Sequence, residues 1–261
     1  MLILIKGAGD LATGVAHRLR KCGFDIVMTE IEKPTTVRRT VAFSQAVFDK
    51  TTEVEGIRGS LAKNIYDIKD IIKNGEVAVI VDENAEIVKE LKPDVVVDAI
   101  IAKKNLGTNI NDAPIVIALG PGFTASVDCH CVVETKRGHY LGKAIYEGSA
   151  IPDTGVPGDI GGYTTERIIR ATDDGSIVPI VNIGDYVEKG QTVAYVNDKK
   201  ILAEINGIVR GMLQEDIKVF KGMKSGDIDP RCEKEHCFTI SDKARSIGGG
   251  VLEGILYLSA N

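Results

Sequence analysis

The chain begins with an apolar run, Leu2 to Ile5, that leads directly into the glycine turn Gly7-Ala8-Gly9 and then into a helix-like segment. Strand, glycine turn and helix in this order are typical of dinucleotide-binding α/β domains. The first glycine permits the sharp turn, the second lets backbone amides approach a pyrophosphate, and a small third residue, here Ala12, allows helix to pack on strand. The N-terminus of the helix then supplies an anion site.

Glu30 supports the same interpretation. It follows the next apolar run, Phe24 to Met28, and lies roughly 18 residues after Ala12, where an acid that binds ribose is expected. In the alternative interpretation the glycines only shape the turn. We predict that the following residues bind a cofactor: Gly7, Gly9, Asp10, Leu11, Ala12 and Glu30.

Further apolar runs alternate with helix-like segments. Val77 to Val81, Val95 to Ile101 and Ile115 to Leu119 are predicted to be buried parallel strands, and Ile65 to Ile72 and Ala85 to Leu91 are predicted helices. This alternation predicts an α/β fold with a Rossmann-like, doubly wound sheet.

A second glycine turn, Gly120-Pro121-Gly122, follows the predicted strand that ends at Leu119. Ligands of open α/β sheets bind beyond the carboxyl ends of the strands. We therefore predict that Gly120, Pro121 and Gly122 face the same ligand crevice as the first turn.

The C-terminal half changes to short alternating strands from Val178 onward, around glycine turns such as Gly184 to Gln191. This pattern resembles the biotinyl/lipoyl hammerhead, a small β domain with a carrier lysine at a hairpin tip. Lys199 and Lys200 lie in a polar turn without an acceptor motif, so we expect solvated turn residues rather than carriers. The glycine/proline-rich loop Gly148 to Tyr163 is either a linker or a ligand loop.

The chain closes with a predicted helix from Ser241 to Leu258, which contains Gly248-Gly249-Gly250. Three glycines weaken a helix, so this segment either breaks there or accepts the cost to let another backbone approach. The predicted organisation is a Rossmann-like domain over 1–130, a hammerhead-like β domain over 131–240 and a C-terminal helix over 241–261.

Cys129, His130 and Cys131 concentrate reactive groups directly after the second glycine turn. One interpretation is a reactive thiolate, which makes these three residues the catalytic candidates. A second is a zinc site shared with Cys232, His236 and Cys237, for which the spacing is poor, so no metal is predicted. In the third, the cysteines pack as small apolar residues.

The motif Gly226 to Arg231 presents two carboxylates, Asp227 and Asp229, two residues apart. They suit either a hard cation or an aspartate-proline turn in which Arg231 is the partner, and we favour the turn.

Composition limits the possible partners and compartments. A net charge of −5 without a basic block argues against nucleic acid, and no apolar stretch approaches the roughly 18 residues of a membrane span. Five cysteines, an odd number, indicate free thiols rather than a disulfide framework. We expect a cytoplasmic protein.

Several stretches together resemble the YqeB type of accessory protein, which accompanies selenium-dependent molybdenum hydroxylases. They are GAGDLATGVAHRL, RRTVAFSQAVFD, DVVVDAIIAKKN, LGPGFTASVDCHCVVETKRGHYLGKAIYEGSAIPDTGVPG and GMKSGDIDPR. The type is also similar to the XdhC chaperones of xanthine dehydrogenase. The resemblance implies a maturation factor for such a hydroxylase, a hydroxylase subunit as its partner, and a molybdopterin dinucleotide as ligand.

Other functions stay open at this level. NAD(P) would use the same glycine turn, which would make the chain an NAD(P)-dependent oxidoreductase, and the β domain could instead be a protein-binding module. The sequence does not show whether turnover occurs. A homo-oligomer is expected.

Overall fold

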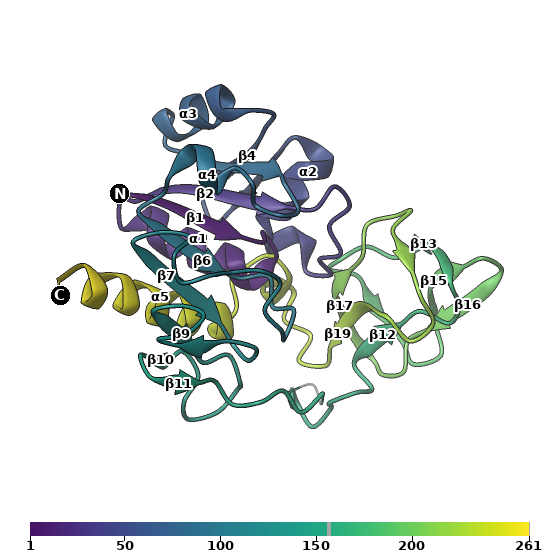
Figure 1. Ribbon diagram of the computed structural model, residues 1–261. Helices are drawn as coiled ribbons and strands as arrows, with labels where there is room; N and C mark the ends of the chain where they lie inside the picture. The colour runs from purple at the N-terminus through teal and green to yellow at the C-terminus, as the bar shows by residue number, and fades with distance from the viewer. Residues whose placement is uncertain (156–157, 261) are drawn as a thin grey trace. The chain divides into compact units, whose positions relative to one another are not determined.

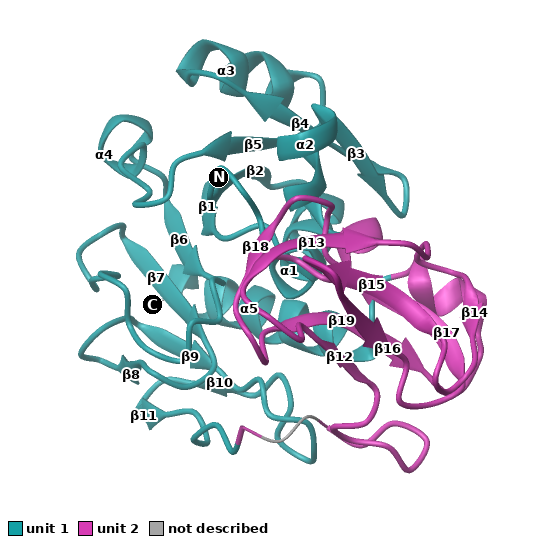
Figure 2. Ribbon diagram, turned by 90° about the vertical axis from the view of Figure 1, so that its right-hand side faces the viewer, with its two compact units in different colours: residues 1–34, 42–154, 240–261 teal, residues 35–41, 155–239 magenta. Residues whose placement is uncertain are grey.

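The computed structural model describes residues 1–155 and 158–260, so two positions of the predicted glycine/proline loop lie outside the described residues. The chain forms two compact units (Figure 2). Unit 1 comprises residues 1–34, 42–154 and 240–261, and unit 2 comprises residues 35–41 and 155–239. This division differs from the predicted boundary at residue 130, because residues 131–154 and the C-terminal helix belong to unit 1.

Unit 1 contains a nine-stranded sheet with the order β10-β9-β7-β6-β1-β2-β5-β4-β3. Neighbouring strands from β9 to β4 in this order are parallel, whereas β10 and β3 pair antiparallel at the two edges. A separate two-stranded sheet pairs β8 with β11. The strands are β1 (Leu2–Lys6), β2 (Asp25–Glu30), β3 (Thr51–Val54), β4 (Ile57–Ala62), β5 (Val77–Val81), β6 (Val95–Asp98), β7 (Ile115–Leu119), β8 (Thr124–Ala125), β9 (Cys131–Val133), β10 (Ala144–Ile145) and β11 (Gly148–Ser149).

The central strands are continuous apolar runs because helices and loops cover them. Helix α1 (Asp10–Lys21) and helix α5 (Asp242–Ala260) lie side by side (Figure 1), and α5 also contacts β7, β9 and β10. Helix α3 (Ile65–Lys73) is capped by Asn64, whose side chain accepts hydrogen bonds from the N–H groups of Tyr66 and Asp67. The helix packs on β2, β4 and β5. The remaining helical segments of unit 1 are single turns: η2 (Phe43–Gln45), α2 (Ala46–Asp49) and α4 (Val88–Leu91).

Helix α5 runs through its three consecutive glycines without a break. A β-carbon at Gly248 would lie 3.0 Å from the carbonyl oxygen of Gly14, and one at Gly250 would overlap the carbonyl oxygen of Gly142. A β-carbon at Gly249 would meet nothing within 4 Å. Two of the three glycines therefore permit close backbone approach, which offsets their low helix propensity.

Unit 2 is built from two four-stranded antiparallel sheets, β12-β19-β17-β14 and β16-β15-β13-β18. Its helical segments are the short turns η1 (Arg39–Val41) and η3 (Lys234–Cys237). The strands are β12 (Ile168–Arg170), β13 (Gly175–Pro179), β14 (Tyr186–Val187), β15 (Thr192–Val196), β16 (Lys199–Leu202), β17 (Gly207–Met212), β18 (Lys218–Val219) and β19 (Lys224–Asp229).

The polar turn that was considered as a carrier site joins β15 to β16. Asn197 adopts φ +53° there, as asparagine often does in tight hairpins, and its side chain donates to the carbonyl oxygen of Asp174 at 3.0 Å. Lys199 forms an ion pair with Asp173 at 2.9 Å. The side chain of Lys199 thus has a partner within unit 2.

The predicted fold class, a Rossmann-like doubly wound sheet with a hammerhead-like β domain, is wrong. A doubly wound sheet needs helical crossovers, but in the described residues the connections from β6 to β7 and from β7 to β9 contain no helix, and both sheet edges are antiparallel. The structure instead has a large mixed sheet and separate antiparallel sheets. Apolar runs specify individual strands, whereas edge pairing and sheet order depend on contacts that lie far apart in sequence.

Among the described residues, no helix is long and apolar enough to span a membrane.

Candidate functional site at the carboxyl edge of the unit 1 sheet

The first glycine turn lies between the two strands that flank β1. The N–H of Gly7 donates to the Thr29 carbonyl at the end of β2, at 2.9 Å, and the N–H of Ala99 donates to the Lys6 carbonyl at 2.9 Å. Gly7 has φ +89°, and a β-carbon there would lie 3.1 Å from the carbonyl oxygen of Ala99. Both the backbone conformation and the space require glycine at this position.

Helix α1 begins directly after this turn. Gly9 is its N-cap residue with an extended backbone, and no side chain in the described part of the chain caps it. Ala12 is buried, Leu11 is half-buried, and Asp10 lies in the first turn, where the helix dipole favours a carboxylate. The start of α1 therefore has the backbone arrangement that binds anions in other helices.

Glu30 lies at the end of β2 and is tied to the glycine turn. Its Oε2 accepts the N–H of Ala8 at 3.0 Å, and its Oε1 accepts the N–H of Ile31 at 2.8 Å. Burial raises the pKa of Glu30, although the two backbone hydrogen bonds oppose the shift. The structure therefore brings Glu30 next to Ala8, two residues before the start of α1.

The sheet order reverses beside this turn. On one side of β1 the sheet continues with β2, β5, β4 and β3, and on the other side it continues with β6, β7, β9 and β10. The chain completes the first side before it crosses from β5 to β6. The switch point lies between β1 and β6, and ligands of open α/β sheets bind beyond the carboxyl ends of the strands at such a point.

A buried polar network lies at the same carboxyl edge of the sheet, and the sequence pattern did not predict it. Lys6 Nζ donates to Thr108 Oγ1 and to Asp112 Oδ2, both at 3.0 Å, and Thr108 Oγ1 donates to Asp98 Oδ2 at 2.7 Å. Burial raises the pKa of Asp98. The available signal was that Lys6 and Asp98 are the polar residues that end two buried apolar strands.

The segment after β6 connects the two glycine turns. Its start, at Ala99, contacts Gly7, and a β-carbon at Gly122 would lie 2.7 Å from the Cα of Lys104. Ile101 in this segment has φ +60°, a strained conformation for a β-branched residue that costs on the order of 1–3 kcal/mol. Such strain is concentrated at functional sites.

The second glycine turn also packs tightly. Gly120 has φ +77°, and a β-carbon there would lie 2.5 Å from Thr135 Oγ1. Pro121 is half-buried. The predicted residues Gly120, Pro121 and Gly122 therefore lie at the same sheet edge as Gly7, with the segment after β6 in contact with both turns.

The cysteines predicted as catalytic candidates lie in the core. Cys129 belongs to an apolar cluster with Val96, Val116 and Phe123, and Cys131 lies against Gly254 of α5. Burial raises the pKa of Cys129 to about 12 and that of Cys131 to about 11. Thiols with these pKa values are protonated at neutral pH, which favours the packing role.

His130 is held by the backbone of β7. The N–H of Val116 donates to its Nδ1 at 3.0 Å, and the N–H of His130 donates to the Val116 carbonyl oxygen at 2.8 Å. No group of three or more histidine, cysteine, aspartate or glutamate residues in the described ranges is arranged to hold a metal ion. The Cys129 region therefore provides no observation that supports chemistry there.

Comparison with known proteins supports one family and corrects the predicted role. No family model matches the chain. The chain is 51% identical over 257 residues, 98% of its length, to the uncharacterized protein YqeB of Escherichia coli K12, which supports the predicted resemblance to the YqeB family. It spans about half, 48%, of the length of that curated relative.

The solved structures that match are of another kind. They include an aspartoacylase family protein from Mesorhizobium loti, 12% identical with a TM-score of 0.25 over 87% of this chain and 83% of that chain. The ectoine utilization protein EutE (DoeB) from Ruegeria pomeroyi is 11% identical with a TM-score of 0.25, over 87% and 84% of the two chains. Likenesses at these TM-scores provide no argument for a deacylase activity in this chain.

The predicted role as a maturation factor for a selenium-dependent molybdenum hydroxylase is corrected to an unassigned one, because the curated relative that is 51% identical has no assigned function. The matching structures include succinylglutamate desuccinylase and aspartoacylase family proteins, but their TM-scores of 0.25 are too low to assign a role. The oxidoreductase and protein-binding alternatives receive no support from these matches.

Proposed function

We propose that unit 1 binds a nucleotide ligand that contains a pyrophosphate at the edge formed by β1, β2 and β6. The main observation in support is the uncapped start of α1 after the Gly7 turn, beside the switch point between β1 and β6. A helix N-terminus in this position offers backbone N–H groups and a favourable dipole to a phosphate.

Glu30 supports the ribose part of this proposal. Each of its carboxylate oxygens accepts one backbone N–H, so each keeps lone-pair capacity for a ligand hydroxyl group. NAD(P) and a molybdopterin dinucleotide both contain a pyrophosphate and a ribose, and both are candidate ligands.

The test is a binding titration with NADH, NADPH and cytidine diphosphate, the last as a fragment of the molybdopterin dinucleotide. The key variant is Gly9→Val, because Gly9 has φ −66° and ψ −177°, an extended conformation that valine adopts without strain. Its side chain would obstruct the approach of a pyrophosphate. Gly249→Ala is the matched control, since that glycine lies in open space.

We expect saturable binding of at least one probe by the parent and the control, and a loss of about tenfold or more in Gly9→Val, because several backbone hydrogen bonds to phosphate are blocked. If the parent binds none of the three probes, the proposal is contradicted. Equal affinities of the parent and a folded Gly9→Val protein contradict it as well.

A further inference from the structure

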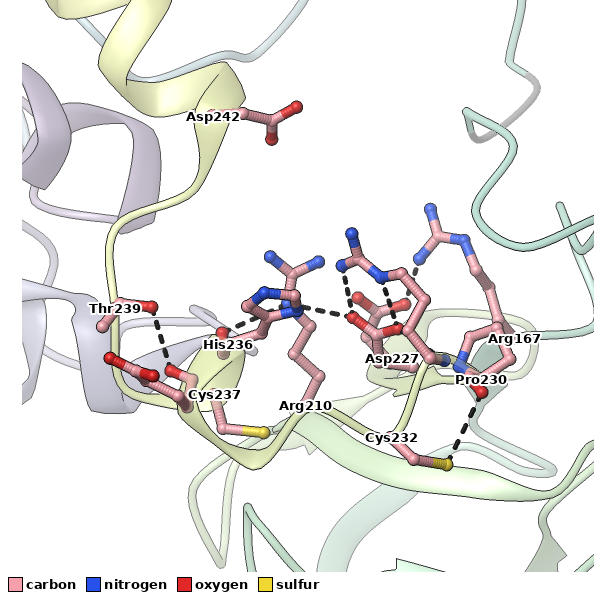
Figure 3. Close-up of polar contacts among 12 residues, drawn as sticks. Arg167, Arg210, Asp227, Pro230, Cys232, His236, Cys237, Thr239 and Asp242 are labelled. Atoms are coloured by element: carbon pink, nitrogen blue, oxygen red, sulfur yellow. Dashed lines mark hydrogen bonds and ion pairs between the residues drawn. The ribbon is translucent and has the colours of Figure 1, made fainter.

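Strand β19 of unit 2 places two carboxylates on one face. Asp227 and Asp229 are two residues apart on the strand, and both are buried. Arg167, next to the paired strand β12, forms an ion pair with Asp227 (Figure 3). Arg231 donates to both oxygens of Asp229, at 2.9 and 2.6 Å. Each carboxylate therefore has its own arginine partner.

Arg210 approaches the same group from β17. The pairing of β17 with β19 shifts between Val209 and Gly211, so Arg210 is the extra residue of a β-bulge. Bulges redirect side chains relative to the regular alternation of a strand. The Nε of Arg210 lies 3.7 Å from Asp229 Oδ2, and the residue is only 6% exposed.

A fourth guanidinium group lies close to Arg210. The carbonyl oxygen of His236 accepts from Arg38 Nη2 at 3.0 Å and from Arg210 Nε at 3.4 Å. Arg38 Nη2 also donates to the carbonyl oxygen of Thr239 at 3.0 Å. Burial, together with the positive charge of Arg38, lowers the pKa of Arg210. The carbonyl oxygen of His236 therefore holds the guanidinium groups of Arg38 and Arg210 next to each other.

Some guanidinium N–H groups in this cluster of arginines and aspartates have no hydrogen-bond acceptor in the part of the chain that the structure describes. Within the described residues, Nη1 and Nη2 of Arg210 make no hydrogen bond, and the buried Nε of Arg167 also lacks a partner. An unsatisfied buried donor such as Arg167 Nε is costly. Guanidinium groups form paired hydrogen bonds with phosphate and carboxylate oxygens, and such oxygens would accept from these donors of Arg210 and Arg167.

We propose that the cluster formed by Arg38, Arg167, Arg210, Arg231, Asp227 and Asp229 binds a phosphate group, and that Arg210 is its main contact. The phosphate is either a free ion or the terminal group of a phosphomonoester. This site lies wholly in unit 2 and is independent of the nucleotide site proposed for unit 1.

The test is calorimetric titration of the whole chain with inorganic phosphate at constant ionic strength, compared with chloride. Arg210→Gln is the key variant, and Arg170→Gln is the matched control because Arg170 is an exposed arginine of the same unit, bonded to the Gly222 carbonyl at 2.9 Å. We expect binding by the parent and the control and a loss of about tenfold or more in Arg210→Gln, as charged hydrogen bonds are removed.

Asp229→Asn should change the phosphate affinity in the direction opposite to Arg210→Gln. It removes a negative charge beside Arg210, so phosphate affinity should increase. A parallel titration with glycerol 2-phosphate distinguishes the two sources, because a phosphomonoester site binds the ester at least as tightly as the free ion. A free-phosphate site prefers the ion.

Nuclear magnetic resonance of the parent protein avoids dependence on the folding of the variants. The Nε–H signals of Arg210 and Arg167 should shift saturably with phosphate, while that of Arg170 should not. The proposal is overturned if the parent shows no saturable phosphate binding, if Arg210→Gln binds as tightly as Arg170→Gln, or if the three arginine signals respond alike.

Discussion

The hydroxyl group of Thr108 donates a hydrogen bond to Asp98 Oδ2 at 2.7 Å. It also accepts a hydrogen bond from Lys6 Nζ at 3.0 Å, and all three side chains are buried. Burial raises the pKa of Asp98 despite the hydrogen bonds from Thr108 and the N–H of Ile100, which favour the carboxylate. Folding therefore disfavours the charged form of Asp98 at the edge of the sheet where we propose ligand binding.

Asp98 should make the free energy of unfolding depend on pH. Its folded pKa lies above its unfolded pKa, so its contribution is fully present below the unfolded value of about 3.9 and is lost as pH rises through the raised folded value. We expect Asp98→Asn to flatten the decline in stability over this window. The slope is reduced rather than abolished, because Glu30 also has a raised pKa.

Urea unfolding at a series of pH values from about 4 to 7 measures this effect, since each unit of pKa difference changes the free energy by about 1.4 kcal/mol. Asp70→Asn is the control, because Asp70 is exposed on α3. A slope in Asp98→Asn that equals the slope in the control would contradict the assignment.

The glycines of α5 should respond differently to alanine. Gly250→Ala places a β-carbon against the carbonyl oxygen of Gly142 and should destabilise the chain by about 1–3 kcal/mol through overpacking. Gly249→Ala meets open space and should stabilise the chain by up to about 1 kcal/mol through helix propensity. Thermal or urea unfolding of the two variants gives the comparison. Equal effects would show that α5 does not pack as described.

The β15–β16 hairpin should stay unmodified. Lipoyl and biotinyl carriers need a free lysine at a hairpin tip, whereas Lys199 pairs with Asp173 at 2.9 Å. We expect peptide mass spectrometry of the protein from its native host to find Lys199 and Lys200 unmodified. A lipoyl or biotinyl mass on Lys199 or Lys200 would contradict this expectation.

Individual elements of unit 1 follow from the sequence because each reflects local pattern. The predicted strands Val77–Val81 and Ile115–Leu119 are confirmed as β5 and β7, and the first strand, glycine turn and helix are confirmed as β1, the Gly7 turn and α1. These runs are long, apolar and bounded by turn residues, and such patterns specify buried strands.

Sheet order and the polar clusters could not be predicted in the same way. Lys6 and Thr108 are far apart in sequence, and the contact between them depends on the pairing of β1 with β6. The contact of Arg210 with Asp229 depends on a β-bulge in the pairing of β17 with β19. Because a one-residue change in register reverses the face of every side chain on a strand, hydrophobic pattern alone does not bring these groups together.

The buried thiols of Cys129 and Cys131 should differ sharply in reactivity from the exposed thiols of Cys22 and Cys232. Cys129 and Cys131 are fully buried, whereas Cys22 and Cys232 are exposed. The thiolate is the form that reacts with iodoacetamide, and burial raises the pKa of Cys129 to about 12 and that of Cys131 to about 11. We expect rapid alkylation of Cys22 and Cys232 at pH 8 and protection of the other two until the chain unfolds.

Peptide mass spectrometry after timed alkylation measures each site within one sample, so the exposed cysteines are the internal control. The same experiment in urea should expose Cys129 and Cys131, because their protection comes from packing in unit 1 and from contact with α5. If either buried cysteine reacts in the folded protein as fast as Cys22, the packing interpretation is wrong. A reactive thiol would then have to be reconsidered at the sheet edge beside Gly120.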